Sequence, residues 1–167
     1  MGAKSKAKGN RYERRVAKLL TEYTSVNFRR IPSSGAFNKF KGVTVAEHVF
    51  SGDIVCDRTD FRFSVEAKSQ KVFSFQAILK DPDNCAFTKW WKQCVEDAQA
   101  VSKVPMLLFK PDTQEDFIAT TGNAIALLKI STIVHFSLNV YSQLPTPKII
   151  RWKTFVEKVN PDRLFGD

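Results

Sequence analysis

The stretch GDIVCDRTDFRFSVEAKS, residues 52–69, decides the fold that we expect for this chain. Two β-prone segments, residues 53–57 and 61–68, are joined by a tight turn through residues 58–59. In the second segment apolar and polar side chains alternate, as they do in a strand that buries one face. The pattern predicts a β-hairpin whose second strand presents four polar side chains on one face: Arg62, Ser64, Glu66 and Lys68.

The expected register of this hairpin brings two carboxylates together. If the residues that flank the turn pair with each other, Asp53 lies opposite Ser64 and diagonal to Glu66 on the same face. Diagonal neighbours lie roughly 7–8 Å apart at their α-carbons, so two carboxylates there can converge on one cation. Lys68 occupies the next position along that face.

Two carboxylates and a lysine in this arrangement suit phosphodiester hydrolysis. We expect Asp53, Glu66 and the carbonyl oxygen of Ala67 to hold Mg²⁺, with Mn²⁺ as a substitute, because Mg²⁺ prefers a few hard oxygen ligands. The ion would lower the pKa of a bound water molecule, while Lys68 orients the nucleophile or stabilises the transition state. The alternative is a solvated strand face with ordinary Glu-Lys pairing.

An amphipathic helix precedes the hairpin, with Asn10 as a suitable N-cap. Its apolar residues recur at helical spacing: Tyr12, Val16, Leu19, Leu20 and Tyr23. Residues 1–9 carry lysines among small residues and are expected to form a flexible basic arm. Residues 10–167 are expected to form a single domain.

Other segments predict an α/β domain in which a mixed central sheet is flanked by helices. A long loop at residues 33–51, rich in Ser, Gly and Lys, is a candidate functional segment. The expected elements are a strand at 26–31, partly helical structure at 69–85, a helix at 87–101, strands at 104–109 and 116–121, and weaker strands at 130–138 and 148–152.

The charge of the chain is concentrated near its N-terminus. Residues 1–41 contain eleven Lys or Arg but only two acidic residues, so the whole net charge of +9 lies there. Such a surface favours nucleic acid as the partner, although a basic tail that only increases solubility is the alternative. There is no apolar run that could span a membrane, so we expect a soluble intracellular protein, in the cytoplasm or in that of a host. The three cysteines lack zinc or disulfide spacing and are expected to be buried free thiols.

The hairpin resembles a known nuclease signature. The motif of the PD-(D/E)xK nucleases is similar to two short segments of the chain, Gly52-Asp53-Ile54-Val55 and Glu66-Ala67-Lys68-Ser69. Twelve residues separate Asp53 from Glu66. The resemblance implies a restriction-endonuclease-like core. The chain departs from the motif at Gly52, where proline is usual.

Upstream residues are similar to those of the archaeal-type Holliday-junction resolvases. They are Tyr12-Glu13-Arg14 and Arg30-Ile31-Pro32-Ser33-Ser34-Gly35. The resemblance implies that Arg30 and Ser34 contact the scissile region of branched DNA. It also implies a homodimer that nicks opposed strands of a four-way junction, and the following active-site residues: Glu13, Asp53, Glu66 and Lys68.

Each of these upstream residues also has a plainer interpretation. Glu13 lies at the edge of the apolar stripe, where a carboxylate needs a nearby cation, but it could instead pair with an arginine of its own helix. Arg30 could be a surface arginine, and Ser34 a turn residue before glycine. Four other basic residues are expected to contact DNA: Arg11, Arg14, Lys39 and Lys41. Four aromatic residues could stack on bases or pack in the core, and core packing is favoured for Trp91: Phe37, Phe40, Trp90 and Trp91.

The sequence therefore predicts a Mg²⁺-dependent endonuclease that resolves four-way junctions without an organic cofactor. Glu13 would bind a second ion or position the first through water. A two-fold symmetric dimer would suit the symmetry of such a junction. The alternatives are a restriction, repair, flap or genome-processing nuclease, an RNA nuclease, and a DNA-binding protein without catalysis.

Overall fold

The computed structural model describes residues 3–31, 51–70, 74–111, 114–130, 135–137 and 143–166. Its helices are α1 (Ala3–Thr24), α3 (Phe75–Lys80), α4 (Ala86–Ala100), α5 (Gly122–Leu127), α6 (Trp152–Lys158) and the 3-10 helix η1 (Pro161–Leu164). Its strands are β1 (Phe28–Arg30), β2 (Ile54–Cys56), β3 (Phe63–Gln70), β4 (Val104–Pro111), β5 (Phe117–Thr120), β6 (Phe136–Ser137) and β7 (Lys148–Arg151).

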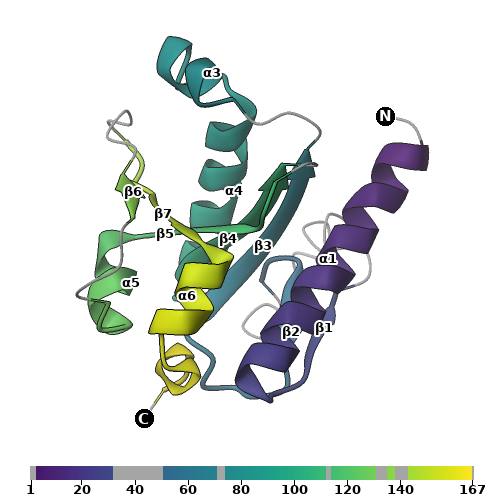
Figure 1. Cartoon of the computed structure of the whole chain (residues 1–167), viewed down its shortest axis with the longest axis vertical. Helices are drawn as coiled ribbons and strands as arrows, with labels where there is room; N and C mark the ends of the chain where they lie inside the picture. The colour runs from purple at the N-terminus through teal and green to yellow at the C-terminus, as the bar shows by residue number, and fades with distance from the viewer. Residues whose placement is uncertain are drawn as a thin grey trace.

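The strands form one mixed sheet of seven strands in the order β1-β2-β3-β4-β5-β7-β6. β3 and β4 run parallel, from the pair Phe63 and Val104 to the pair Gln70 and Pro111. The other neighbouring strands of the described residues pair antiparallel. A parallel pair needs a crossover connection, which α3 and α4 provide here (Figure 1).

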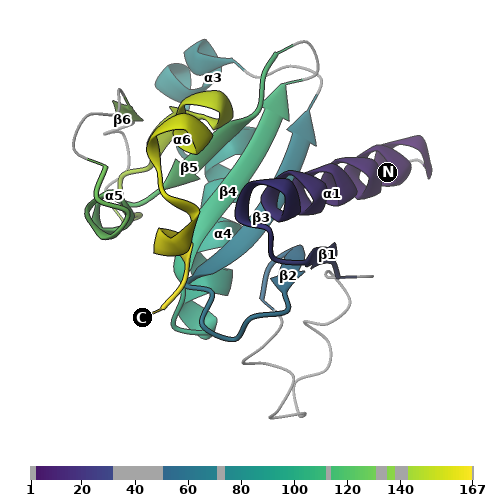
Figure 2. The same ribbon diagram turned by 60° about the horizontal axis from the view of Figure 1, so that its bottom comes forward.

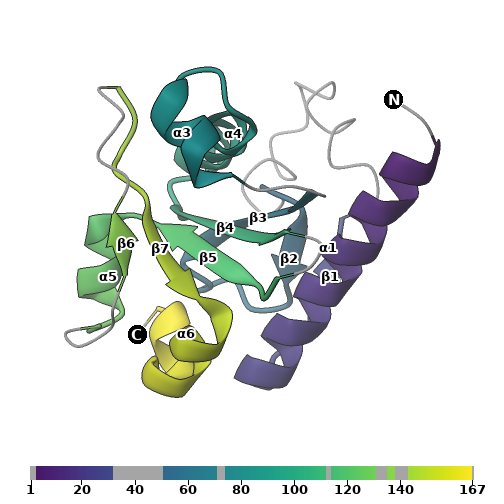
Figure 3. The ribbon, with the colours of Figure 1, turned by 45° about the horizontal axis from the view of Figure 1, so that its top comes forward.

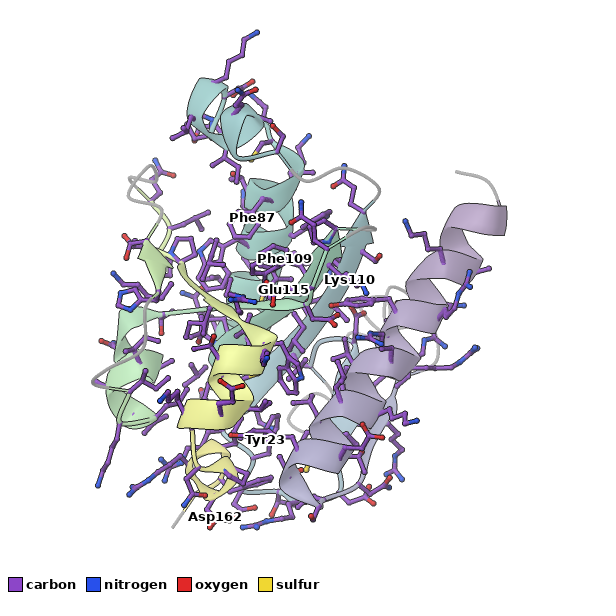
Figure 4. The ribbon with its side chains drawn as sticks, in the orientation of Figure 1. Tyr23, Phe87, Phe109, Lys110, Glu115 and Asp162 are labelled. Atoms are coloured by element: carbon purple, nitrogen blue, oxygen red, sulfur yellow. The ribbon has the colours of Figure 1, made fainter. Side chains whose placement is uncertain are left out.

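Helices cover both faces of the sheet. α1, α5 and α6 pack on one face, and α3 and α4 on the other (Figures 2 and 3). The α1-side core includes Val16, Leu20, Phe63, Val65, Leu108 and Phe155. The α4-side core includes Ile78, Phe87, Trp91, Leu107 and Phe109. In this second core the rings of Phe87 on α4 and Phe109 on β4 meet edge to face, with centroids 5.4 Å apart (Figure 4).

The α/β fold with a mixed sheet flanked by helices is confirmed, and so are most of the predicted elements. The start of the first helix is wrong, because α1 begins at Ala3 instead of near Asn10. Residues 3–9, which were expected in a flexible arm, form the first turns of that helix. Of the weak strand predicted at 130–138, the described part contains only the short β6.

The hairpin forms, but its register differs from the expectation by two residues. Ile54 pairs with Val65, whereas the expected register would pair it with Phe63. The tight turn is wrong, because six residues, 57–62, separate β2 from β3. A shift by an even number of residues leaves every side chain on its original face. The predicted grouping of Asp53, Glu66 and Lys68 therefore survives the error.

The polar face of β3 is not a solvated surface. Ser64 and Glu66 are buried, although they lie on the face opposite to Phe63 and Val65. α4 packs against this part of β3 and β4 and excludes water from it. The alternative of ordinary Glu-Lys pairs on an exposed strand is therefore wrong.

The predicted burial of the tryptophan and cysteine side chains is confirmed in part. Trp91 is fully buried, which confirms its core role, and Trp90 is partly buried against the α4-side core. All three cysteines are free thiols, but only Cys94 is buried. Within the described parts of the chain, no helix is long and apolar enough to cross a membrane.

Candidate active site

Asp53 is held at the start of β2 by a sharp bend of the chain. The bend occurs at Gly52, whose φ of 81° lies in the region that favours glycine. A β-carbon at this position would overlap the carbonyl oxygen of Val65. Neither proline nor another L-residue fits there, which explains why Gly52 stands where the nuclease motif usually has proline.

The bend directs the Asp53 side chain toward β3. The backbone N–H of Asp53 donates to the carbonyl oxygen of Val65 over 2.8 Å. In return, the N–H of Ala67 donates to Oδ2 of Asp53 over 3.1 Å. These bonds fix the buried carboxylate of Asp53 directly before β2, beside β3.

Glu66 is more deeply buried than Asp53, with 1% of its surface exposed. Its Oε1 accepts a hydrogen bond of 3.0 Å from Nε2 of Gln93 on α4. Its Oε2 is the one buried side-chain oxygen among the described residues that no well-aligned donor satisfies. Burial, and then repulsion by the carboxylate of Asp53, raise the pKa of Glu66 to about 9.

Lys68 joins the two carboxylates. Its Nζ lies 2.8 Å from Oε2 of Glu66 and 3.7 Å from Oδ2 of Asp53. Burial opposes the charge of this ammonium, but Glu66 and Asp53 outweigh it and raise the pKa of Lys68. The predicted convergence of the three side chains is therefore found in the structure.

The residues present fit a hard divalent cation. Two carboxylates lie close enough to repel each other, and Oε2 of Glu66 has the ion pair with Lys68 but no well-aligned hydrogen bond. Mg²⁺ is commonly bound by one or two carboxylates. Here it would reduce the repulsion between them and give the buried oxygen of Glu66 a partner. In the described parts of the chain, no three His, Cys, Asp or Glu side chains gather around a metal position. Glu13 is thus not gathered with Asp53 and Glu66 around one position, and its predicted role at a second ion or through a water molecule remains a prediction.

Glu13 lies beside this centre and binds Arg30. The carboxylate accepts from Nε of Arg30 across the gap between α1 and β1, and both side chains are largely buried. Asn10, one turn earlier on α1, accepts from the same guanidinium over 2.9 Å. The pair is not the intrahelical one considered from the sequence. Glu13 is near enough to Lys68 to raise its pKa, although less than Glu66 and Asp53 do.

The other predicted DNA contacts divide into two groups. Arg11 and Arg14 are exposed on α1, so they are accessible to a partner. Ser34, Lys39 and Lys41, together with Phe37 and Phe40, lie outside the described residues. The DNA-binding roles of all these residues remain predictions.

Sequence reasoning missed two groups of residues that shape the site. Gln93 lies on the exposed side of an amphipathic helix, and nothing in the sequence shows that it reaches Glu66. Asp116 is a buried carboxylate that binds Tyr12 and Arg15 of α1. Only the structure shows this contact, because about a hundred residues separate the partners.

The chain is similar to known proteins over nearly its whole length. A family described as "Phage putative PDDEXK endonuclease" matches residues 4–165. Protein D14 of Escherichia phage T5 is 28% identical over 142 residues, which are 83% of this chain and 84% of that protein. The structure of Archaeoglobus fulgidus Hjc, a Holliday junction resolvase from an archaeal hyperthermophile, aligns over 94% of each chain with 12% identity and a TM-score of 0.42. That structural likeness is too distant to bear on function.

Proposed function

This chain belongs to the phage PD-(D/E)xK endonuclease family, and we propose that it hydrolyses DNA phosphodiesters with a divalent ion and resolves four-way junctions. One observation carries the proposal. The ammonium of Lys68 lies within 3.7 Å of carboxylate oxygens from both Asp53 and Glu66. Two carboxylates can hold a divalent ion, and a lysine beside them can stabilise the charge on the phosphate that the ion binds.

Asp53 and Glu66 would hold the ion, together with the carbonyl oxygen of Ala67. When bound, Mg²⁺ neutralises charge on the phosphate and makes a coordinated water molecule more acidic. Mn²⁺, which also accepts oxygen ligands, is expected to substitute for Mg²⁺.

The remaining side chains bind and orient. Gln93 fixes one oxygen of Glu66, so the other oxygen stays directed toward Lys68. Lys68 would stabilise the charge that develops on the phosphate oxygens. The Glu13–Arg30 pair would position the substrate phosphate or a metal-bound water molecule beside the centre.

Branched DNA is the proposed substrate class. Arg11 and Arg14 are exposed on the same helix as Glu13, so a DNA backbone at the centre could bind them. A four-way junction has approximate two-fold symmetry, and a symmetric dimer would place one such centre on each of two opposed strands. We therefore propose a homodimer as the active form.

Matched DNA substrates test the proposal. The wild-type protein is incubated with a four-way junction, a flap and a linear duplex that share one labelled strand, with Mg²⁺, with Mn²⁺ or with EDTA. We expect cutting in either metal, none in EDTA, and a clear preference for the junction with paired nicks. Equal rates on all three substrates would rule out the resolvase function but leave the nuclease function. No cutting of any DNA or RNA in either metal would rule out both.

A further inference from the structure

A buried carboxylate outside the proposed metal centre ties α1 to the middle of the sheet. Asp116, directly before β5, is 5% exposed. Its Oδ1 accepts a hydrogen bond of 3.0 Å from the hydroxyl of Tyr12, and its Oδ2 lies 2.6 Å from the guanidinium of Arg15. Both carboxylate oxygens of Asp116 thus bind residues of the same turn of α1.

The position of Asp116 is itself fixed by the sheet. Its carbonyl oxygen accepts from the N–H of Trp152 over 2.8 Å, next to the β5–β7 pair of Phe117 and Arg151. β5 neighbours β4, whose C-terminal end lies beside that of β3, which carries Lys68. Asp116 therefore links α1 to hydrogen-bonded strands of the sheet, near the C-terminal ends of β3 and β4, where Lys68 also lies.

The geometry of α1 connects this link to Glu13. Tyr12 and Arg15 are three residues apart and share one stripe of the helix, which meets Asp116. Asn10 and Glu13 have the same spacing on an adjoining stripe, which meets Arg30 of β1. Successive residues of a helix differ by about 100° around its axis. A rotation of α1 that moved the first stripe would therefore also move Glu13.

We propose that Asp116 is a positioning residue for the nuclease reaction. Through Tyr12 and Arg15 it sets the rotation of α1 and so holds Glu13 against Arg30 beside Lys68. This inference rests on the proposed function, because it assumes that Glu13 takes part in DNA cleavage.

A second tyrosine of α1 provides a matched control. The hydroxyl of Tyr23 donates to the carbonyl oxygen of Val159, so it also anchors α1 through one hydrogen bond. Tyr23 lies at the C-terminal end of α1, ten residues beyond Glu13, and faces α6 (Figure 4). Tyr23→Phe and Tyr12→Phe each remove one hydroxyl from the same helix, but only Tyr12→Phe loosens the turn that carries Glu13.

Single-turnover cleavage separates positioning from plain stabilisation. We expect Asp116→Asn to lower the rate at saturating DNA roughly ten- to hundredfold, as for supporting residues at other sites. Tyr12→Phe should lower this rate less, and neither change should weaken DNA binding. Tyr23→Phe should keep the wild-type rate. Circular dichroism checks that each variant is folded at the assay temperature. If Tyr23→Phe slows cleavage as much as Tyr12→Phe does, or Asp116→Asn has the wild-type rate, the proposal is wrong.

A double-mutant cycle tests whether Asp116 acts through Glu13. When one residue works only through another, its replacement has no further effect once the second is gone. Asp116→Asn should therefore not slow a Glu13→Gln variant any further. Rate losses that multiply in the double variant would contradict a positioning role.

A spectroscopic readout keeps the test independent of catalysis. The Nε–H of Arg30 donates to Glu13, so it should give a protected side-chain NMR signal that disappears in Arg30→Lys. We expect Asp116→Asn to shift and broaden this signal, and Tyr23→Phe to leave it unchanged. An unaltered signal in Asp116→Asn would overturn the inference even if the enzyme is active. If the wild-type protein does not cleave DNA, the proposed function is wrong. The NMR signal of Arg30 would still test the link from Asp116 to Glu13.

Discussion

Nε2 of Gln93 on α4 lies 3.0 Å from Oε1 of Glu66 on β3 and donates a hydrogen bond to it. This contact crosses from one layer of the fold to the other and fixes how the most buried carboxylate of the site is oriented. α4 therefore supports the proposed metal centre as well as filling the core.

Replacing Gln93 should therefore impair the centre without unfolding the protein. We expect Gln93→Ala to raise the Mg²⁺ concentration needed for half-maximal cleavage by roughly ten- to hundredfold, because groups that orient metal ligands commonly contribute that much. The control is Lys92→Ala, which removes an exposed neighbour on the same helix. A Mg²⁺ dependence equal to that of the Lys92→Ala variant would contradict the role of Gln93.

Removing the ionisable carboxyl group of Glu66 should stabilise the metal-free protein. The pKa of Glu66 is about 9 in the fold, against an ordinary value of 4.5, because of burial and repulsion by Asp53. Between these two values the unfolded chain releases a proton that the folded chain retains, so stability falls as the pH rises. The slope is at most about 1.4 kcal/mol per pH unit.

Glu66→Gln cannot ionise, and it should be more stable than wild type in EDTA by a margin that grows from pH 5 to pH 9. Urea unfolding across this range measures the margin. Mg²⁺ should stabilise the wild type but not this variant. A stability difference that is independent of pH, or that shrinks as the pH rises, would argue against repulsion between the carboxylates of Asp53 and Glu66.

Gly52 should tolerate no substitution, including the proline that is usual in the nuclease motif. Gly52→Ala introduces a β-carbon that overlaps the backbone of Val65, at a residue with positive φ. We expect a loss of at least about 2 kcal/mol in the free energy of unfolding, together with loss of cleavage.

The control for this change is Gly122→Ala at the start of α5, where, among the described residues, a β-carbon would meet only the Lys148 side chain at 3.8 Å. That variant should be as stable as wild type or slightly more stable. Comparable losses from the two substitutions would show that the bend at Gly52 does not require glycine.

The sequence was sufficient to predict the three central side chains because their grouping depends on strand alternation. The register was wrong by two residues, since the loop after β2 is longer than a tight turn. An even shift keeps Asp53 and Glu66 on one face, and the observed pairing places them more nearly opposite each other. A shift by one residue would have separated them.

What the sequence could not provide are contacts between distant layers. Glu66 is buried because α4 covers β3, and Asp116 meets Tyr12 because β5 begins near α1. Neither contact leaves a periodic pattern within one element. The early start of α1 was missed for another reason: lysine and alanine favour helix, and the small polar residues near them were interpreted as an arm.

The decisive test of a metal site built on Asp53 and Glu66 is the rate of single-turnover cleavage in Mg²⁺ by Asp53→Asn, with Asp57→Asn as its control. Asp57 directly follows β2, the strand that Asp53 precedes. It is exposed and pairs with Arg29 at 3.1 Å, away from Asp53 and Glu66. Asp53→Asn should bind a four-way junction without cutting it, while Asp57→Asn should cut at the wild-type rate. Cleavage by Asp53→Asn at the wild-type rate would contradict a metal centre built on Asp53 and Glu66.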